Sequence, residues 1–158
     1  MTPTIRRAED RDTDRILELL RQVCSVHSDG RPDLFRKGGT KYSREELAIL
    51  FHDDTRPVFV AVDDRDEVLG YCFCIFIEYS GNGALHDRRE LYIDDLCVDR
   101  EKRRLGVGAL LYDHAKDFAK EAGCYHMTLN VWACNQGAMA FYESRGMRML
   151  KKEMEVIL

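Results

Sequence analysis

Residues 94–118 read DDLCVDREKRRLGVGALLYDHAKDF, in which an apolar strand pattern, a basic loop with two glycines and a helical pattern follow one another. Leu111, Ala115 and Phe118 share one helical stripe, which predicts a helix over residues 104–122 that Gly123 ends. The first N–H groups of such a helix have no partner and the helix dipole adds positive charge there, so its beginning can hold a phosphate group. The stretch therefore predicts a strand, an anion-binding turn and a helix.

The residues of the turn favour phosphate binding without deciding it alone. Gly106 and Gly108 remove side chains where an anion would approach the backbone, and Arg103 and Arg104 add forked hydrogen-bond donors. A P-loop would need Lys and then Ser or Thr after its glycines, and a dinucleotide fingerprint would need a third small residue near Leu111 and an early position in the chain. The chain meets neither requirement. A pyrophosphate cradle and a glycine turn that only packs against the sheet both fit this pattern.

The composition restricts the class of protein. At 158 residues with 45% hydrophobic content, the chain can bury one core, so residues 1–158 are predicted to form a single domain. A net charge of -4 argues against nucleic acid or an anionic membrane as the main partner. The longest apolar run, residues 69–77, is about half of a membrane span and the N-terminus lacks a signal pattern, so we expect a soluble cytoplasmic protein. The six cysteines and five histidines show no ligand spacing, and no metal is predicted.

Strand and helix patterns alternate along the whole chain. A strand, an amphipathic helix, a polar loop and a short capped helix precede a hairpin of two β-branched runs. The predicted strands are residues 4–7, 57–62, 68–78, 90–98, 125–131 and 147–158, and the predicted helices are residues 10–26, 43–51, 104–122 and 135–144. This order predicts an α/β (α+β) fold with a mixed, mostly antiparallel sheet and helices on both faces.

A second motif favours the phosphate reading of the glycine turn. Residues 135–146 read NQGAMAFYESRG, which puts Asn135, Ala138 and Tyr142 close to one helical face and ends the helix at Gly146. RRLGVG at 103–108 and this NxxAxxFYxxxG pattern together resemble the GNAT superfamily of acyl-CoA N-acyltransferases. The order of strands and helices resembles that fold over the whole chain. Leu105 is one mild departure, because relatives often carry a polar residue or glycine there.

The resemblance implies a six- to seven-stranded sheet that opens in a V between its fourth and fifth strands and holds acetyl-CoA there. It implies that the pantetheine arm pairs with the backbone of residues 96–98, where an N–H would polarise the thioester carbonyl, and that Tyr142 protonates the departing thiolate. Acylation of Cys97 ranks below direct transfer, because the motif holds no paired histidine. The cofactor-binding residues expected on this basis are Leu96, Cys97, Val98, Arg103, Arg104, Leu105, Gly106, Val107, Gly108, Ala109, Asn135, Ala138 and Tyr142.

The acidic fourth strand is the predicted acceptor side. Asp94 and Asp95 are neighbours on that strand and are expected on opposite faces. Residues 92–98 resemble the corresponding strand of polyamine acetyltransferases within the family, which implies that Asp94 is the base or the amine anchor. A structural salt bridge at Asp94 is nearly as consistent with the sequence. Glu78 is a weaker substrate-binding candidate, and Phe35 belongs to the loop that is expected to form the acceptor-side wall.

These observations predict an acetyl-CoA-dependent N-acetyltransferase, a transferase in which a primary amine attacks directly in a ternary complex. The acidic strand slightly favours a small cationic amine, while polyamine, amino acid, protein N-terminus, lysine and aminoglycoside acceptors all remain open. A non-catalytic acyl-CoA-binding sensor or regulatory module is the alternative, and Tyr142 argues against it. The predicted closing strand would leave an exposed sheet edge, which a second copy could cover in a homodimer.

Overall fold

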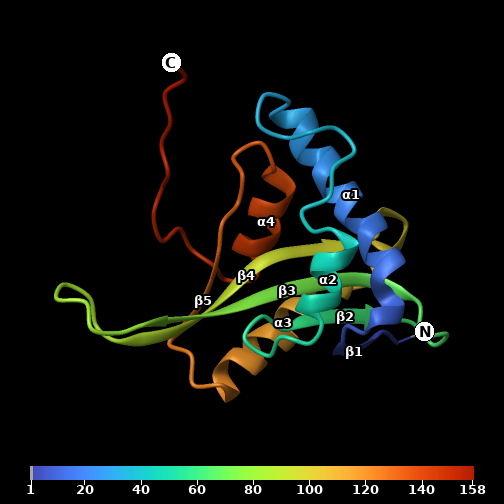
Figure 1. Ribbon diagram of the computed structural model, residues 1–158, viewed down its shortest axis with the longest axis horizontal. Coiled ribbons are helices and arrows are strands. Elements are labelled where there is room, and N and C mark those ends of the chain that lie inside the picture. The colour runs from blue at the N-terminus through green and yellow to red at the C-terminus, as the bar shows by residue number, and fades with distance from the viewer. Residues whose placement is uncertain (1) are drawn as a thin grey trace.

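A computed structural model of the protein describes residues 2–158 and contains one five-stranded sheet flanked by helices (Figure 1). None of the helices in this part of the chain has the length and the apolar composition that crossing a bilayer requires. The strands are β1 (Thr4–Arg7), β2 (Val58–Val62), β3 (Val68–Tyr79), β4 (Arg88–Val98) and β5 (His126–Leu129). The helices are α1 (Thr13–Gly30), α2 (Arg44–Leu50), α3 (Val107–Glu121) and α4 (Gln136–Ser144), with two short 3-10 turns, η1 (Asp10–Asp12) and η2 (Arg100–Lys102).

The strands lie side by side in the order in which they follow along the chain, from β1 to β5. β1 to β4 pair antiparallel, whereas β5 joins β4 in parallel because α3 carries the chain back across one face of the sheet. The predicted mixed, mostly antiparallel sheet is confirmed, but it has five strands rather than six or seven.

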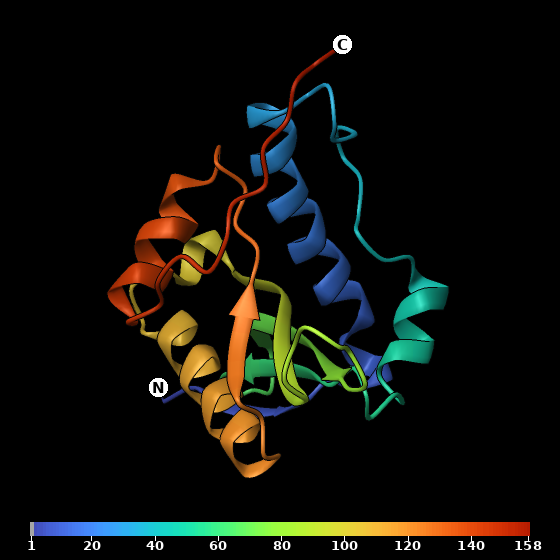
Figure 2. The same cartoon turned by 90° about the vertical axis from the view of Figure 1, so that its left-hand side faces the viewer.

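Helices cover both faces of the sheet (Figure 2), as the sequence predicted. α1 and α2 pack on one face, where Ile16 and Leu47 lie in one core with Tyr71 of β3. α3 and α4 pack on the other face, where Leu111 lies in a second core with Cys72 of β3. Successive residues of a strand point to opposite faces, so the central strand supplies both cores. We call these two sides of the sheet the α1–α2 face and the α3–α4 face.

Local hydrogen bonds explain the limits of the first two helices. Ser43 and Glu46 form the predicted capping box, because the Glu46 N–H donates to Ser43 Oγ at 3.1 Å and the Ser43 N–H donates to the Glu46 carboxylate at 2.7 Å. α1 continues to Gly30, beyond its predicted end at residue 26, and the Arg31 N–H closes its last turn on the His27 carbonyl at 2.7 Å. The loop between the two helices is therefore shorter than predicted.

The pairing of β3 with β4 is irregular at one position, which lies at the candidate site. Phe73 of β3 lies opposite Asp95, and the next residue, Cys74, lies opposite Ile93. Asp94 is left without a partner of its own and forms a β-bulge. A bulge interrupts the alternation of side chains along a strand, so the direction of Asp94 no longer follows from its position in the sequence.

The last residues do not form the predicted closing strand. Residues 148–158 are extended but belong to no strand, and their backbone makes no hydrogen bond to other backbone groups of the described chain. A strand requires a neighbour as well as an alternating sequence, and this segment has no neighbour in place. We call residues 148–158 the C-terminal arm, which leaves the end of α4 as a separate extended segment (Figure 1).

Candidate active site

β4 and β5 stay paired over only four positions. Residues 90–93 of β4 pair with residues 126–129 of β5, and the pairing ends at Ile93 and Leu129. Residues 94–98 therefore have β3 on one side and no strand on the other. We call this segment the open edge of β4. It lies where the family resemblance placed the V-shaped opening.

Some backbone N–H and C=O groups of the open edge are not used in pairing with β3. The Asp99 N–H donates to the Leu69 carbonyl of β3 at 2.9 Å, and bonded residues alternate in an antiparallel pair, so Leu96 and Val98 direct their backbone groups away from β3. The Val98 carbonyl accepts a hydrogen bond from the Gln22 side chain at 2.9 Å. The Leu96 N–H makes no hydrogen bond to another backbone group within residues 2–158, and the Asp95 carboxylate lies near it. This amide can donate to a carbonyl oxygen placed at the open edge.

The turn before α3 presents a row of unpaired amides. From Arg103 to Ala109, no backbone N–H donates to an acceptor in the described chain, and the first helical bond joins the Leu110 N–H to the Gly106 carbonyl at 2.9 Å. Arg104 and Gly106 have positive φ values of 68° and 74°. Left-handed residues of this kind occur in the backbone nests that bind anions, and a helix N-terminus adds positive charge. The turn is therefore suited to a phosphate group.

The two glycines of this turn have different roles. A Cβ atom at Gly106 would meet nothing within 4 Å, so this position keeps the space around the amides open. A Cβ atom at Gly108 would lie 3.4 Å from Phe141 of α4 and 3.6 Å from Val98 of β4. Gly108 therefore lies where α3, α4 and β4 pack together, with room for a methyl group in ordinary contact, so it has the packing role that the sequence left open beside anion binding. The neighbouring Arg103 and Arg104 side chains are exposed and free to meet an anion.

α4 carries the second motif. The Asn135 side chain accepts a hydrogen bond from the Ala138 N–H at 3.2 Å and so caps the helix. Tyr142 is 9% exposed and belongs to the core of the α3–α4 face. Burial raises the pKa of Tyr142 well above its ordinary value, and the nearby Cys72 and Asp95 raise it further. The phenol therefore stays protonated at neutral pH, as a proton donor must.

Both acidic residues of the bulge lie on the α1–α2 face, so the prediction of opposite faces is wrong. The Asp94 carboxylate accepts hydrogen bonds from the Tyr42 hydroxyl and from Lys41 Nζ, the latter at 2.9 Å. Lys41 also donates to the Asp94 carbonyl at 2.9 Å. Asp95 accepts a hydrogen bond from the Tyr71 hydroxyl at 2.9 Å. The Tyr42 and Tyr71 rings both pack against Phe73 of β3. Asp94 and Asp95, which they contact, therefore lie on the same side of the sheet.

Asp95 has an ionisation close to neutral pH. Burial raises the pKa of Asp95 from 3.8 to about 6, and the Asp94 carboxylate contributes in the same direction. Hydrogen bonding by the Tyr71 hydroxyl and by the Leu96 N–H acts in the opposite direction. Sequence reasoning chose Asp94 as the base and passed over Asp95, because nothing in the sequence marks the bulge that turns both toward the same face.

Three aromatic rings form a cluster on the acceptor-side loop. The ring centroid of Phe35 lies 4.8 Å from that of Trp132 and 4.9 Å from that of His27. The cluster joins the end of α1, the loop that follows it and the segment after β5. The contact brings the loop around Phe35 to the segment that follows β5, and the two partners of Phe35 in this cluster, Trp132 and His27, were not predicted. Trp132 lies three residues before the Asn135 motif, but no local sequence pattern predicts its contact with Phe35.

Two other predicted residues point elsewhere. Glu78 lies toward the far end of the β3–β4 pair, where its carboxylate is 2.6 Å from Arg89. The Cys97 thiol faces α1, and burial raises the pKa of Cys97 to about 12, so it is not ionised at neutral pH.

No group of three or more potential metal ligands occurs within residues 2–158. The remaining predicted positions differ in exposure: Leu105 is exposed, Val107 is buried, and Leu96, Val98 and Ala109 are partly buried.

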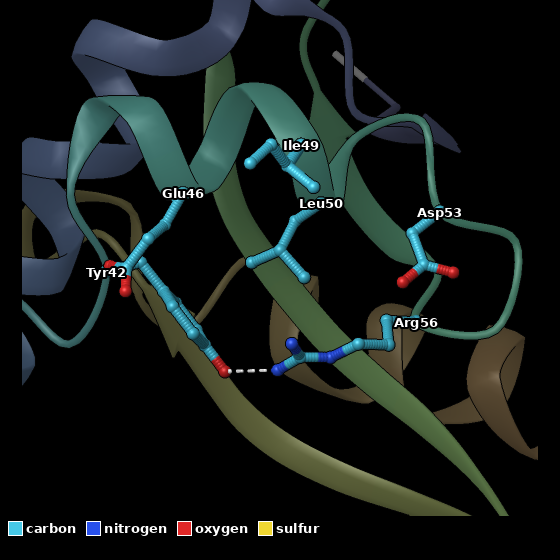
Figure 3. A pocket seen from close by; sticks show the side chains of 6 residues that line it. All are labelled: Tyr42, Glu46, Ile49, Leu50, Asp53 and Arg56. Carbon is cyan, nitrogen blue, oxygen red and sulfur yellow. Dashed lines mark hydrogen bonds between the residues drawn. The ribbon is translucent and has the colours of Figure 1, made fainter.

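A small hollow is lined by residues of α2 and of the segments on either side of it (Figure 3). The Tyr42 hydroxyl, which donates to Asp94, accepts a hydrogen bond from Arg56 at 3.0 Å in this hollow. Its volume of about 150 Å³ is below the range of roughly 300–1,000 Å³ typical of small-molecule sites. The hollow is therefore not the acyl-CoA site. Its lining residues are Tyr42, Glu46, Ile49, Leu50, Asp53 and Arg56.

Comparison with known proteins agrees with this arrangement. Residues 17–147 match the acetyltransferase (GNAT) family, and the chain belongs to this family. Peptidyl-lysine N-acetyltransferase YjaB of Escherichia coli is 28% identical over 149 residues, which cover 94% of this chain and 84% of that protein. Streptothricin acetyltransferase of Streptomyces lavendulae is 35% identical over 88 residues, or 56% of this chain and 42% of that protein. The crystal structure of a mutant BH1408 protein from Bacillus halodurans is 30% identical, with a TM-score of 0.94 over 98% of this chain and 99% of that chain.

The protein is an N-acetyltransferase, and its family implies acetyl-CoA as the cosubstrate. The residues around the open edge of β4 fit that molecule. The amide row at the start of α3 and the adjacent Arg103 and Arg104 suit a pyrophosphate group, and the Leu96 N–H suits a thioester carbonyl.

Proposed function

We propose that this enzyme transfers an acetyl group from acetyl-CoA directly to a primary amine in a ternary complex, and that the acceptor is a small cationic amine. The observation that carries the proposal is the position of Lys41. Its ammonium group lies 2.9 Å from both the carboxylate and the backbone carbonyl of Asp94, at the open edge of β4. The site thus binds a primary ammonium group of its own chain, and an acceptor that displaces Lys41 would find the same two oxygens.

The cosubstrate would be held from the α3–α4 side. The amides of residues 103–109, with the Arg103 and Arg104 side chains, would bind the pyrophosphate. The pantetheine arm would lie along residues 96–98, and the Leu96 N–H would stabilise negative charge on the thioester oxygen. Asn135 would act indirectly, by fixing the start of α4.

The proposed base and acid lie on opposite faces of the sheet. Asp95 contacts Tyr71 on the α1–α2 face, whereas Tyr142 lies in the core of the α3–α4 face. An amine that attacks from the α1–α2 face and a thiolate that leaves toward the α3–α4 face would each meet a group that transfers protons. With a pKa of about 6, Asp95 is ionised at neutral pH and can accept a proton, while Tyr142 is protonated and can donate one.

The acceptor makes a base necessary. An amine with a pKa near that of lysine is uncharged in only about one molecule in 2,500 at pH 7. We assign the anchoring role to Asp94, because its carboxylate is already bound by Lys41 and Tyr42, and the proton-accepting role to Asp95. This assignment changes the base predicted from the sequence.

Two observations favour a cationic amine over a neutral one. Asp94 and Asp95 put two carboxyl groups on one face at the bulge, and the rings of Phe35 and Trp132 offer aromatic surface that can face a cation. The names of two relatives, a peptidyl-lysine acetyltransferase and a streptothricin acetyltransferase, also refer to amine acceptors of different size. The panel of acceptors must therefore include both small amines and lysine peptides.

The experiment that tests this proposal is release of CoA thiol from acetyl-CoA in the presence of polyamines, amino acids, aminoglycosides, lysine peptides and N-terminal peptides. We expect release to depend on one class of acceptor and to fall roughly 10²- to 10⁴-fold in Tyr142→Phe, with CoA affinity unchanged. Tyr112→Phe is the matched control, because Tyr112 is also buried and its ring centroid lies 6.4 Å from that of Tyr142. CoA binding without thiol release for any acceptor would contradict the proposal and favour a sensor.

A further inference from the structure

Lys41 is presented to the acceptor side of the site by a fixed segment of its own chain. The next residue, Tyr42, stacks its ring on Phe73 of β3 with the ring centroids 5.3 Å apart, and Ser43 caps α2. The Lys41 side chain is 45% exposed, and its ammonium group lies 2.9 Å from both the carboxylate and the carbonyl oxygen of Asp94. The backbone that carries this amine is therefore held in place, while the amine itself stays accessible.

The Lys41 ammonium group acts electrostatically on groups at both borders of the acceptor side. Burial raises the pKa of Asp95, and the Lys41 charge acts against that rise. Burial lowers the pKa of His27, which packs on Phe35, and the Lys41 charge lowers it further. The ammonium group thus lies near both the acids of the bulge and the aromatic cluster, where the proposed acceptor amine would bind.

The backbone that binds Lys41 belongs to the same edge as the proposed thioester site. Asp94 has no partner in β3, and its carbonyl accepts from Lys41. Leu96 follows two residues later, and its backbone groups point away from β3. The Lys41 amine and an acyl group bound by the Leu96 N–H would therefore meet at the open edge of β4 without a rearrangement of the fold.

We propose that this enzyme acetylates Lys41 of its own chain, which makes Lys41 a modification site. The inference rests on the proposed transfer from acetyl-CoA to an amine and adds an acceptor that the chain itself supplies. Asp95 takes a proton from the ammonium group, and the neutral nitrogen attacks the thioester carbonyl carbon, so that a C–N bond forms and the C–S bond breaks.

The protons of this reaction balance. The nitrogen loses two protons in all. One passes to Asp95, which releases it to solvent, and the other replaces, through water, the proton that Tyr142 gives to the departing thiolate. The products are N-acetyl-Lys41 and the CoA thiol.

Placement favours Lys41 over the other lysines of the chain. A nucleophile held beside its target reacts as though at a very high concentration, with effective molarities of up to about 10⁵–10⁸ M. Lys37 is exposed in the same loop but has no such placement in the site. The acetylated side chain carries no charge, so it cannot return to Asp94 as an ammonium group. We therefore expect one acetyl group per chain.

Mass spectrometry of the whole chain after incubation with acetyl-CoA alone tests the proposal. We expect a gain of one acetyl group, located on Lys41 by peptide mapping, at a rate that does not depend on protein concentration. Lys41→Arg should abolish the gain, whereas Lys37→Arg, the matched control in the same loop, should be acetylated like wild type. In the urea-unfolded chain, Lys41 should react no faster than Lys37. Equal modification of both lysines in the folded chain, or a rate that rises with protein concentration, overturns the proposal.

An added acceptor separates this inference from the proposed function. An amine that supports thiol release should slow the acetylation of Lys41, because both compete for Asp94, and a rate that a saturating amine leaves unchanged overturns the inference. Thiol release with an added amine but an unmodified Lys41 would overturn this inference alone. N-acetyl-Lys41 without further thiol release for any added amine would support it and contradict the small cationic acceptor.

Discussion

Replacing Asp95 with asparagine should stabilise the protein at neutral pH and change its stability little in acid. Burial raises the pKa of Asp95 from 3.8 to about 6, so the folded chain binds this proton more tightly than the unfolded chain does. The contribution of the carboxyl group to stability is therefore complete below pH 3.8 and is lost as the pH rises through about 6. At about 1.4 kcal/mol per pH unit, the loss at neutral pH amounts to roughly 3 kcal/mol.

The asparagine side chain would stay neutral at every pH, while its amide oxygen can still accept the Tyr71 hydrogen bond. The Asp95→Asn variant should thus gain roughly 3 kcal/mol in free energy of unfolding over wild type at neutral pH, which corresponds to roughly 6–12 °C in thermal midpoint for a chain of this size. At about pH 3.5 the two proteins should differ little, because the folded wild type then carries a protonated Asp95 and most unfolded chains do as well.

Urea unfolding at a series of pH values, followed by circular dichroism and by the fluorescence of Trp132, measures this difference. Asp94→Asn is the matched control on the same bulge. The Asp94 charge raises the pKa of Asp95, so removing it should move the pH of the stability loss downward rather than abolish the loss. A difference between Asp95→Asn and wild type that is the same at acid and neutral pH would refute the reasoning. So would a carboxyl titration of Asp95, measured by NMR, with a midpoint at the ordinary value for an aspartate.

Substitutions at three further places test the binding residues. Arg103→Ala with Arg104→Ala should weaken CoA binding by at least roughly 10-fold, since charge-assisted hydrogen bonds contribute about 1.5–3 kcal/mol each. Calorimetry measures this affinity, and an unchanged value would contradict the assignment of the two arginines to the pyrophosphate. Gly108→Leu should abolish CoA binding and lower the thermal midpoint, because its side chain would separate α3 from α4. Gly108→Ala should do neither, because its Cβ atom meets only van der Waals contacts, the shortest at 3.4 Å. Equal behaviour of the two variants would argue against close packing at this position. Lys41→Ala should lower the KM for the acceptor, because it frees the Asp94 carboxylate, and should leave CoA affinity unchanged. Lys41→Arg should keep the wild-type KM. An unchanged KM in Lys41→Ala would mean that the acceptor binds elsewhere.

Much of the fold was predictable because its signals are local. The apolar spacing of the helix after the glycine turn, the Ser43–Glu46 capping box and the β-branched runs of the hairpin depend on neighbours within a few residues. The unpaired amides of residues 106–109 also follow from a helix that begins after glycine. These features could be found without knowing which strands lie side by side.

The candidate site was predictable only in part, because it combines segments that are distant in the chain. Lys41 and Tyr42 meet Asp94 across 52 or more residues, and Phe35 meets Trp132 across the sheet opening. No pattern in the local sequence predicts either contact. The prediction of Asp94 as an amine-binding residue therefore came from resemblance to a family, and its actual partners came from the structure.

The sequence by itself determined the helices, the glycine turn and the alternation of the strands, since these follow from covalent geometry and from side-chain spacing. Only the tertiary structure decided which alternating segments find a neighbour. The pairing of β3 with β4 skips Asp94 and so turns both acids to one face, where burial raises the pKa of Asp95 to about 6. The C-terminal arm has the alternation of a strand but no neighbour within the described part of its chain. Strand pairing is a contact between distant segments, so alternation predicts which residues can form a strand and only the assembled sheet determines whether they do.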